Sequence, residues 1–198
     1  YQKNGSTVKK NYYFCKLIAY YVSINKKIME LSQFIRNIPD FPVAGVQFKD
    51  ITTLLNNPTA LKLAFDQMAE KHRVEKIDQI VGMESRGFIF GVPLAFILGC
   101  GFVPIRKPGK LPAEVIREEY SLEYGTNSLE IHKDAFQPGS NILIVDDLLA
   151  TGGTAKAAAN LISKLEGNIV GFDFLIEIEF LNGRKQIENY KINSYIIF

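Results

Sequence analysis

The sequence predicts an α/β fold in which helices flank a central, mostly parallel sheet. Apolar segments of strand length alternate with helical segments along the chain, and this alternation is typical of parallel α/β sheets. Polar, glycine-containing loops follow the strand-like segments 77–83 and 141–146. In parallel α/β sheets, ligands bind to loops at the carboxyl ends of the strands, which is where these two loops would lie. The length of 198 residues suits one domain with a full hydrophobic core.

The first part of the core predicts two helices separated by a loop. Residues 30–37, ELSQFIRN, repeat apolar side chains at helical spacing. Residues 38–52, IPDFPVAGVQFKDIT, contain prolines and a glycine that break regular structure, so they predict a shaped loop. Residues 57–72, NPTALKLAFDQMAEKH, predict a helix that begins at Pro58, since proline is favoured in the first turn.

The middle of the chain predicts strands, a loop and a hairpin. Residues 77–83 and 101–107 predict two strands. The polar segment 106–117, which contains prolines and a glycine, predicts a long mobile loop, and such loops are often functional. Residues 118–136 alternate between apolar and polar side chains, which predicts a β-hairpin with its turn at residues 125–127.

Composition limits the classes of function. Lys and Arg number 23 against 21 Asp and Glu, a net charge of +2, which gives no indication of a nucleic-acid or membrane partner. Any basic site is therefore expected to be local. The only cysteines, Cys15 and Cys100, form neither a disulfide framework nor a zinc site, so a reducing cytoplasm is the expected location.

Residues 1–28 are predicted to be an N-terminal extension outside a core domain at 29–198. The apolar run 11–24, NYYFCKLIAYYVSI, can be read as a secretory signal, but Lys16 interrupts it and no small-x-small cleavage site follows. The run is also too short to span a bilayer. Met29 opens MELSQFIRNIPDFP, which has the character of a natural N-terminus.

The segment 141–161, NILIVDDLLATGGTAKAAANL, predicts a site for a phosphorylated sugar. It opens as a strand up to Asp146 and becomes a helix from about Thr154, and another strand is predicted at 168–180. Glycine amides and a helix N-terminus suit a phosphate, and this loop comprises Ala150, Thr151, Gly152, Gly153 and Thr154. Carboxylates would repel a phosphate, so Asp146 and Asp147 suit sugar hydroxyls or a metal. Together they indicate a ribose 5-phosphate.

Other readings of this loop are weaker. The Walker loop needs Gly-Lys-Ser/Thr, and the dinucleotide fingerprint needs G-x-G-x-x-G; neither is present. A phospho-acceptor receiver domain places acids at strand ends but has no reason for the TGGT sequence. The plain structural alternative is a tight turn with a helix cap at Thr154.

Several segments resemble one known family. ILIVDDLLATGGTA resembles the signature with which type I phosphoribosyltransferases bind 5-phosphoribosyl 1-pyrophosphate. IPDFPVAGVQFKDIT, ESRGFIFG, IRKPGKLP and YSLEYGTNSLEIHKDA resemble the adenine phosphoribosyltransferase branch, in the same order, from about Leu31 to Phe198. The resemblance implies the type I phosphoribosyltransferase fold, with a small N-terminal hood and a flexible loop and hairpin.

The resemblance also implies an activity and its partners. The family converts adenine and 5-phosphoribosyl 1-pyrophosphate to AMP and pyrophosphate in purine salvage. It implies Mg²⁺ held mainly by substrate, a cytoplasmic homodimer, and no nucleic-acid or membrane partner. Two alternatives stay open: a sister enzyme for hypoxanthine, guanine, xanthine or orotate, and a non-catalytic nucleic-acid-binding regulator on the same fold.

Site residues are carried over from the family by position. Asp146 and Asp147 would hold the ribose hydroxyls. The pyrophosphate loop would comprise Glu84, Ser85, Arg86 and Gly87, with a cis peptide bond between Glu84 and Ser85. Loop cations that would reach the pyrophosphate are Arg106, Lys107 and Lys110. Adenine would be bound by Gln47, Phe48 and Lys49, although the family commonly has Arg where this chain has Lys49.

Glu123 and Tyr124 complete the expected site. By resemblance, Glu123 exchanges a proton with the base near N7 or N9, and Tyr124 shapes the closed loop. From the pattern alone, Glu123 lies on the polar face of the hairpin, where a glutamate is usually solvated. Three other residues also have an alternative interpretation without a binding role. Arg86 could be an ordinary surface arginine, Lys110 could belong to a solvated charged loop, and Phe48 could be a core aromatic.

Overall fold

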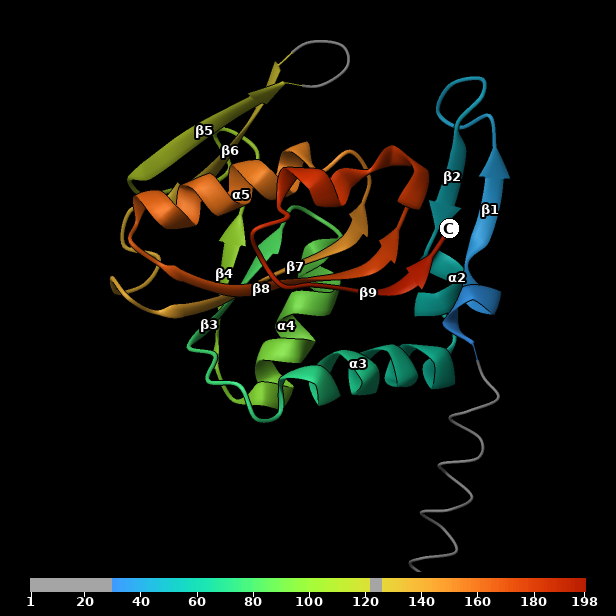
Figure 1. Cartoon of the computed structure of the whole chain (residues 1–198), viewed down its shortest axis with the longest axis horizontal. Helices are drawn as coiled ribbons and strands as arrows, with labels where there is room; N and C mark the ends of the chain where they lie inside the picture. The colour runs from blue at the N-terminus through green and yellow to red at the C-terminus, as the bar shows by residue number, and fades with distance from the viewer. Residues whose placement is uncertain (1–29, 122–125) are drawn as a thin grey trace, which may run out of the picture. The chain divides into compact units, whose positions relative to one another are not determined.

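A five-stranded parallel sheet forms the centre of residues 64–198 in the computed structural model (Figure 1). Its strands are, in spatial order, β4 (Gly101–Ile105), β3 (Gln79–Met83), β7 (Asn141–Leu149), β8 (Asn168–Glu177) and β9 (Ile192–Ile197). The middle strands are almost entirely buried, which explains their continuous apolar sequences. The predicted α/β class with a parallel sheet is confirmed.

Helices cover both faces of this sheet. Helix α4 (Gly87–Leu98) packs against β3 and β7, and α5 (Gly153–Lys164) packs against β8 from the opposite face (Figure 1). Four small side chains allow α5 to lie close to the sheet, namely the buried Ala155, Ala157, Ala158 and Ala159. This packing places the carboxyl end of β7 and the start of α5 together at one edge of the sheet.

The structure describes residues 30–121 and 126–198. The chain divides into two compact units, Tyr1–Leu63 and Ala64–Phe198, and each is described by itself. The predicted extension at residues 1–28 lies outside the described residues, so that boundary stays a prediction. Within the described ranges, no helix combines the length and apolar character that crossing a membrane requires.

The described part of the first unit corrects two predictions. The helix expected at 30–37 is only a 3-10 turn, η1 (Leu31–Phe34), and the expected loop contains a strand. Strands β1 (Arg36–Pro39) and β2 (Gln47–Asp50) pair in antiparallel fashion. The pairing supplies backbone hydrogen bonds that a helix ending before Pro39 could not, and Arg36 donates to Asp50 across it at 2.9 Å. Helix α2 (Thr52–Leu55) follows, and α3 (Pro58–His72) begins at the predicted residue and spans the boundary between the units.

The hairpin in the second unit differs from its prediction at both ends. Strand β5 (Val115–Ser121) starts earlier than expected, because its first residues pair with the end of β6 (Thr126–His132). The loop predicted at 106–117 is therefore shorter. Thr126 and Asn127, expected in the turn, belong to β6 instead.

Two other element ends are also corrected. Strand β7 continues to Leu149 rather than ending at Asp146, because its last residues pair with β8. The strand predicted at 168–180 ends at Glu177, and two 3-10 turns follow: η2 (Glu179–Leu181) and η3 (Gly183–Gln186).

Candidate active site

The loop between β7 and α5 presents backbone amides to an anion. Gly152 is the N-cap residue of α5 and has φ +84°, a left-handed conformation that glycine adopts without strain. Among the described residues, no side chain caps the first turn of the helix. The predicted alternative, a helix cap at Thr154, is therefore wrong. The unsatisfied N–H groups and the helix dipole make this turn suited to a phosphate.

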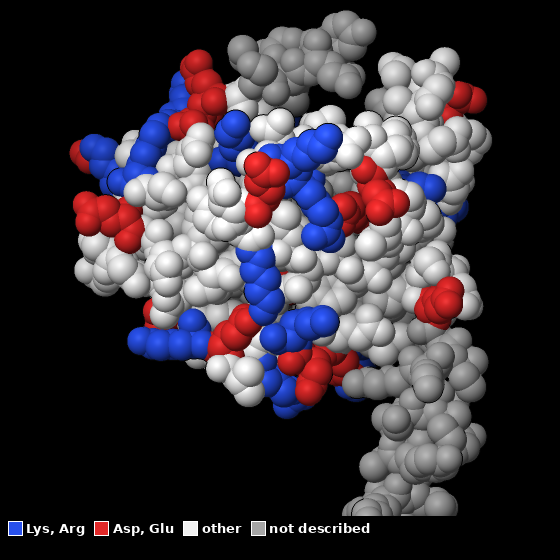
Figure 2. All heavy atoms as spheres, in the orientation of Figure 1, with Lys and Arg blue, Asp and Glu red and all other residues white. Residues whose placement is uncertain are grey.

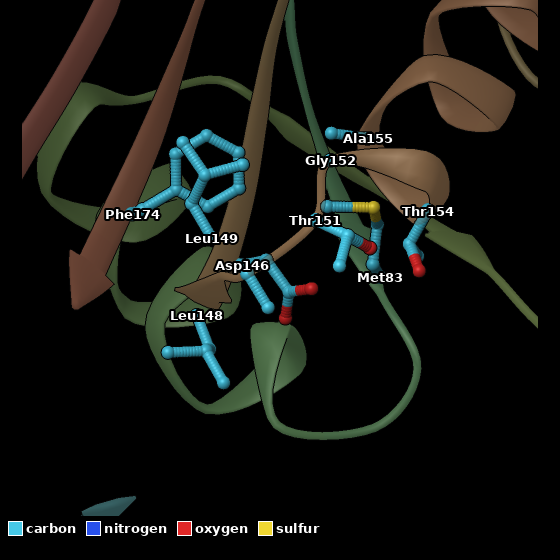
Figure 3. Close-up of a pocket in the computed structure, with 10 residues that line it drawn as sticks. Met83, Asp146, Leu148, Leu149, Thr151, Gly152, Thr154, Ala155 and Phe174 are labelled. Atoms are coloured by element: carbon cyan, nitrogen blue, oxygen red, sulfur yellow. The ribbon is translucent and has the colours of Figure 1, made fainter. Parts of the chain in front are cut away.

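A cavity of about 70 Å³ lies beside this loop. Asp146, Thr151 and Thr154 bring oxygen atoms to it (Figure 3). The other lining residues are Met83, Leu148, Leu149, Ala150, Gly152, Ala155 and Phe174. Since one water needs roughly 10–15 Å³ measured this way, the space accepts a phosphate-sized group. The structure thus brings a carboxylate and four of the five predicted loop residues, all except Gly153, around one cavity.

Asp146 and Asp147 have different surroundings although they are adjacent. Asp146 lines the cavity, and one of its oxygens accepts a hydrogen bond of 2.8 Å from the backbone N–H of Asp147. The Asp147 carboxylate is only 5% exposed and lies 2.9 Å from the guanidinium Nε of Arg86. That contact is an ion pair without hydrogen-bond alignment, since among the described residues none donates a hydrogen bond to Asp147 Oδ2.

The acid pair carries an electrostatic cost. Burial and the charge of Asp147 raise the pKa of Asp146 well above the usual range of an aspartate. Burial also raises the pKa of Asp147, and the Arg86 guanidinium only partly offsets that effect. The buried Asp147 and the half-buried Asp146 are disfavoured as two adjacent charged carboxylates, so the site gains from a ligand whose hydroxyl groups donate to them.

Gly87 explains how the loop 84–87 reaches the two acids. A Cβ atom at this position would lie 2.7 Å from the carbonyl oxygen of Val145 and 2.9 Å from Asp146 Oδ1. Only glycine therefore allows the start of α4 to pack against the end of β7. The Glu84–Ser85 peptide bond that precedes it is cis, as the family resemblance implies.

The predicted loop cations gather at one carboxylate. Glu84 accepts hydrogen bonds from the side chain of Lys110, from the backbone N–H of Lys107 at 2.9 Å and from Arg106 Nε at 3.3 Å. Burial acts to raise the pKa of Glu84, but these donors outweigh it and lower the pKa to about 2. The structure therefore joins the loop cations to the pyrophosphate loop, through an acid whose partners the sequence did not reveal.

Glu130 of β6 is a buried acid that also holds the loop after β4, and sequence reasoning missed it. Its carboxylate accepts a hydrogen bond of 2.9 Å from the Gly109 N–H and one of 3.0 Å from Arg117 Nε. It thereby ties the loop after β4 to the hairpin. Its only sequence signal was an acid within the alternating segment SLEIH, which predicts a solvated side chain equally well.

Glu123 and Tyr124 lie outside the described residues, so their roles stay predictions. The strands that flank them are anchored to α5 within the second unit. Glu118 of β5 accepts a hydrogen bond from Asn160 at 2.7 Å and pairs with Lys164. The hairpin is thus held against α5, the helix that begins at the loop 150–154.

Gln47, Phe48 and Lys49 lie together on β2 in the first unit. Asn37 donates a hydrogen bond to Gln47 Oε1 at 2.7 Å and accepts one from Lys49 Nζ at 3.1 Å. The Phe48 ring contacts Phe41 edge-on with centroids 5.1 Å apart. Phe48 is half-buried rather than a fully enclosed core residue, so the plain reading as core does not hold.

Comparison with known proteins identifies the family. A family model for the phosphoribosyl transferase domain matches residues 50–194. A curated adenine phosphoribosyltransferase of Brachyspira hyodysenteriae is 58% identical over 85% of this chain and 99% of the relative. The chain belongs to the adenine phosphoribosyltransferase family. Another family member, from Halothermothrix orenii, is 60% identical over 83% of this chain and 96% of its own length.

Solved structures of the adenine phosphoribosyltransferase family share the fold. The enzyme of Thermoanaerobacter pseudethanolicus has a TM-score of 0.83 and 52% identity, covering 85% of this chain and 98% of its own. The Saccharomyces cerevisiae enzyme, solved with an imino-altritol bisphosphate and adenine, has a TM-score of 0.79 and 43% identity, covering 83% and 96%. As a member of this family, the chain is a pentosyltransferase, and the expected type I fold is confirmed.

Proposed function

We propose that the chain transfers the 5-phosphoribosyl group of 5-phosphoribosyl 1-pyrophosphate to N9 of adenine, which gives AMP and pyrophosphate in purine salvage. The observation that carries the proposal is the cavity that joins Asp146 to the uncapped first turn of α5. A ribose 5-phosphate would place its phosphate at the helix N-terminus and its hydroxyls at the carboxylate, both of which line this one cavity. Family membership then supplies the base and the leaving group.

The 5-phosphate anchors the substrate away from the reacting carbon. Amides of residues 151–154 bind its oxygens, while Asp146 and Asp147 accept hydrogen bonds from the 2′ and 3′ hydroxyls. This remote binding energy fixes the position of C1′, where the bond to pyrophosphate breaks. The negative field of the acids also favours the positive charge that develops on the ribosyl ring.

The leaving pyrophosphate needs cations. Arg86, Arg106 and Lys110 already lie at this edge of the second unit, held by Asp147 and Glu84. These pairs keep the cations close before the substrate arrives. When pyrophosphate binds, its oxygens take over part of the hydrogen bonding and the cations stabilise the charge of the leaving group.

Mg²⁺ fits this site as a partner of the substrate. Within the described ranges, no group of three or more His, Cys, Asp and Glu side chains is arranged to hold a metal ion. Mg²⁺ commonly takes one or two carboxylates together with substrate phosphates, and Asp146 offers a carboxylate beside the phosphate loop. When bound, Mg²⁺ would neutralise charge on the pyrophosphate.

The adenine-binding and proton-transfer roles rest on family resemblance. Phe48 stacks on the purine, and backbone groups near Gln47 and Lys49 read its edge. Glu123 exchanges the proton with the base, and Tyr124 closes the loop. These residues carry the choice of base, so they separate this proposal from a sister enzyme for hypoxanthine or guanine.

We also propose a cytoplasmic homodimer. Helix α4 exposes an apolar face formed by Ile89, Val92, Phe96 and Ile97, with Phe96 87% exposed. Their spacing of three, seven and eight residues from Ile89 places them on one side of the helix. An exposed apolar face of this kind is typical of a protein interface, and a second copy of this chain is the occupant we propose.

On the face shown in Figure 2, the charge of the described residues gives no support to a nucleic-acid-binding role. Basic and acidic side chains lie close to one another on the face shown in Figure 2. The net charge of the chain is +2. A sequence-independent grip on phosphate backbones needs a concentrated basic surface.

A base-selectivity assay tests the proposed function. Purified protein is incubated with 5-phosphoribosyl 1-pyrophosphate, Mg²⁺ and labelled adenine, hypoxanthine or guanine in parallel. Efficient conversion of adenine alone supports the proposal. A higher kcat/KM for hypoxanthine or guanine would overturn the choice of base and leave the phosphoribosyl transfer intact.

A further inference from the structure

The segment between β8 and β9 packs against the loop 150–154, which we call the phosphate loop. Gly183, the first residue of η3, is buried. A Cβ atom built on Gly183 would lie 2.2 Å from the carbonyl oxygen of Ala150 and 3.0 Å from the backbone nitrogen of Gly152. Side chains do not approach backbone atoms that closely, so a larger residue at position 183 displaces the loop or the turn.

The fit is reciprocal. Gly152 holds φ at +84°, and a Cβ atom there would lie 2.3 Å from the carbonyl oxygen of Gly183. Each glycine leaves the space that the backbone of the other occupies. The left-handed turn at Gly152 is the point at which the chain leaves the loop and enters α5. Gly183 therefore supports the residue that aims the first turn of the helix at the cavity.

Arg184 fixes this support to the sheet. Its guanidinium forms a bidentate pair with the buried Glu177, with distances of 2.7 Å and 2.6 Å, and also donates to Ser194 Oγ at 3.1 Å. Glu177 stands opposite Leu149 in the register of β8 and β7. The pair is thus located where the phosphate loop leaves its strand. Burial acts to raise the pKa of Glu177, but the hydrogen bonds from Arg184 outweigh it and lower the pKa.

We propose that Gly183 and Arg184 are positioning residues for the 5-phosphate of the substrate. Arg184 holds η3 on the end of the sheet, and Gly183 holds the backbone of Ala150 and Gly152 in the conformation that binds phosphate. Neither residue touches the phosphate itself. The inference rests on the proposed function for the identity of the phosphorylated sugar, but its geometry comes only from the contacts around η3.

The test compares binding of the phosphorylated sugar with binding of the base. Gly183→Ala is expected to raise KM for 5-phosphoribosyl 1-pyrophosphate on the order of 10²-fold, as a displacement of about 1 Å in a binding loop does. The dissociation constant of ribose 5-phosphate, measured by calorimetry, rises in parallel, while KM for adenine stays close to the wild-type value. Arg184→Met raises the same two quantities, and Arg184→Lys raises them less, because lysine keeps the charge but loses the bidentate geometry.

Two control variants separate positioning from general loss of packing. Gly167→Ala inserts a methyl group 2.6 Å from Ile162 Cγ2 at the far end of α5, so it lowers the melting temperature without a selective change in ribose 5-phosphate affinity. Lys185→Ala removes an exposed side chain next to Arg184 in η3, and it changes neither the melting temperature nor the ribose 5-phosphate affinity.

The outcomes are distinct. Unchanged ribose 5-phosphate affinity in folded Gly183→Ala or Arg184→Met overturns the inference, and so does an equal loss in Gly167→Ala. If Gly183→Ala does not fold, the ribose 5-phosphate affinities of Arg184→Met and Arg184→Lys test the inference. If the wild type binds ribose 5-phosphate but makes no AMP, the proposed function fails, and the ribose 5-phosphate affinities of the variants still test the positioning role. If the wild type does not bind ribose 5-phosphate, both are overturned.

Discussion

Arg86 Nε lies 2.9 Å from Asp147 Oδ2, so the pyrophosphate loop is tied to the strand that carries the predicted ribose-binding acids. Asp146, the neighbour of Asp147, faces the cavity instead. The two carboxylates therefore have different contacts before substrate binds. Asp147 pairs with the Arg86 guanidinium, whereas Asp146 faces the cavity in which we place the ribose hydroxyls.

Asp146→Asn is expected to stabilise the ligand-free protein and to impair activity. Because the pKa of Asp146 is raised in the folded state, this group costs the wild type stability as pH rises from the usual aspartate range through the folded pKa, and the variant lacks this contribution. Loss of one or two hydrogen bonds to a charged acceptor lowers kcat/KM for 5-phosphoribosyl 1-pyrophosphate roughly 10–10⁴-fold. Thermal unfolding at pH 7 and steady-state kinetics measure both. A less stable variant would contradict the account.

Glu84→Gln is expected to loosen the loop after β4. The change removes the ion pairs to Lys110 and Arg106, so trypsin cleaves faster after Lys110, and kcat/KM falls about tenfold as the cations lose their position. Because the pKa of Glu84 is about 2, wild-type cleavage shows no step from this group between pH 5 and pH 9. Glu114→Gln, which removes an exposed pair with Lys133, is the control. Equal cleavage rates in the two variants would argue against a holding role for Glu84.

His72 is expected to be protonated at neutral pH. Its ring nitrogens lie 2.6 Å from Glu75 Oε2 and 2.9 Å from Asp173 Oδ2, and both contacts become donated hydrogen bonds only in the imidazolium form. Burial acts to lower the pKa of His72, but the bond and charge of Asp173, followed by those of Glu75, raise it. Tyr195 also donates to Asp173 and Lys191 pairs with Glu75, which completes a network at the sheet edge.

The His72 network sets a pH window for stability. Since the folded pKa is above the unfolded value of about 6.5, the stabilisation is fully present below pH 6.5 and is lost as pH rises through the folded pKa. His72→Gln leaves the buried Asp173 without its cation and costs roughly 3 kcal/mol. Unfolding in urea across this range, with NMR titration of His72, gives the measurement. A His72 resonance that titrates below pH 6 would refute the assignment.

Phe96→Glu is expected to convert the homodimer to a monomer. The change places a charge in the centre of the apolar face of α4, where burial against a partner would require its desolvation. Light scattering after size-exclusion chromatography reports the mass. Phe180→Glu, at an exposed position in η2 and outside α4, leaves the dimer unchanged. A wild-type monomer, or a dimer that survives Phe96→Glu, would exclude this interface.

Local patterns in the sequence were sufficient to predict most of the sheet. The apolar runs of β3, β7 and β8 are continuous because both faces are buried, and their alternation with helices indicates parallel order. The helix expected at 30–37 failed because β1 takes its hydrogen bonds from β2, 14 residues away at Arg36 and Asp50. The end of β7 was placed three residues early because its pairing with β8 is also non-local.

The candidate site also contains residues that the local sequence predicts and residues that only the folded structure reveals. Asp146 and the TGGT loop stand in one short segment, so their chemistry could be predicted from residue types alone. Gly183 and Arg184 gave no such signal, because their contacts with Gly152 and Glu177 exist only after the chain folds back. Glu130 was hidden for the same reason: its hydrogen bond with Gly109 joins residues 21 apart.

The most direct test of the central claim is a crystal structure with AMP bound. The account predicts the phosphate oxygens about 3 Å from backbone nitrogens of residues 151–154, with a ribose hydroxyl donating to Asp146. A phosphate seated on Lys110 and Arg106, with the turn before α5 empty, would contradict it.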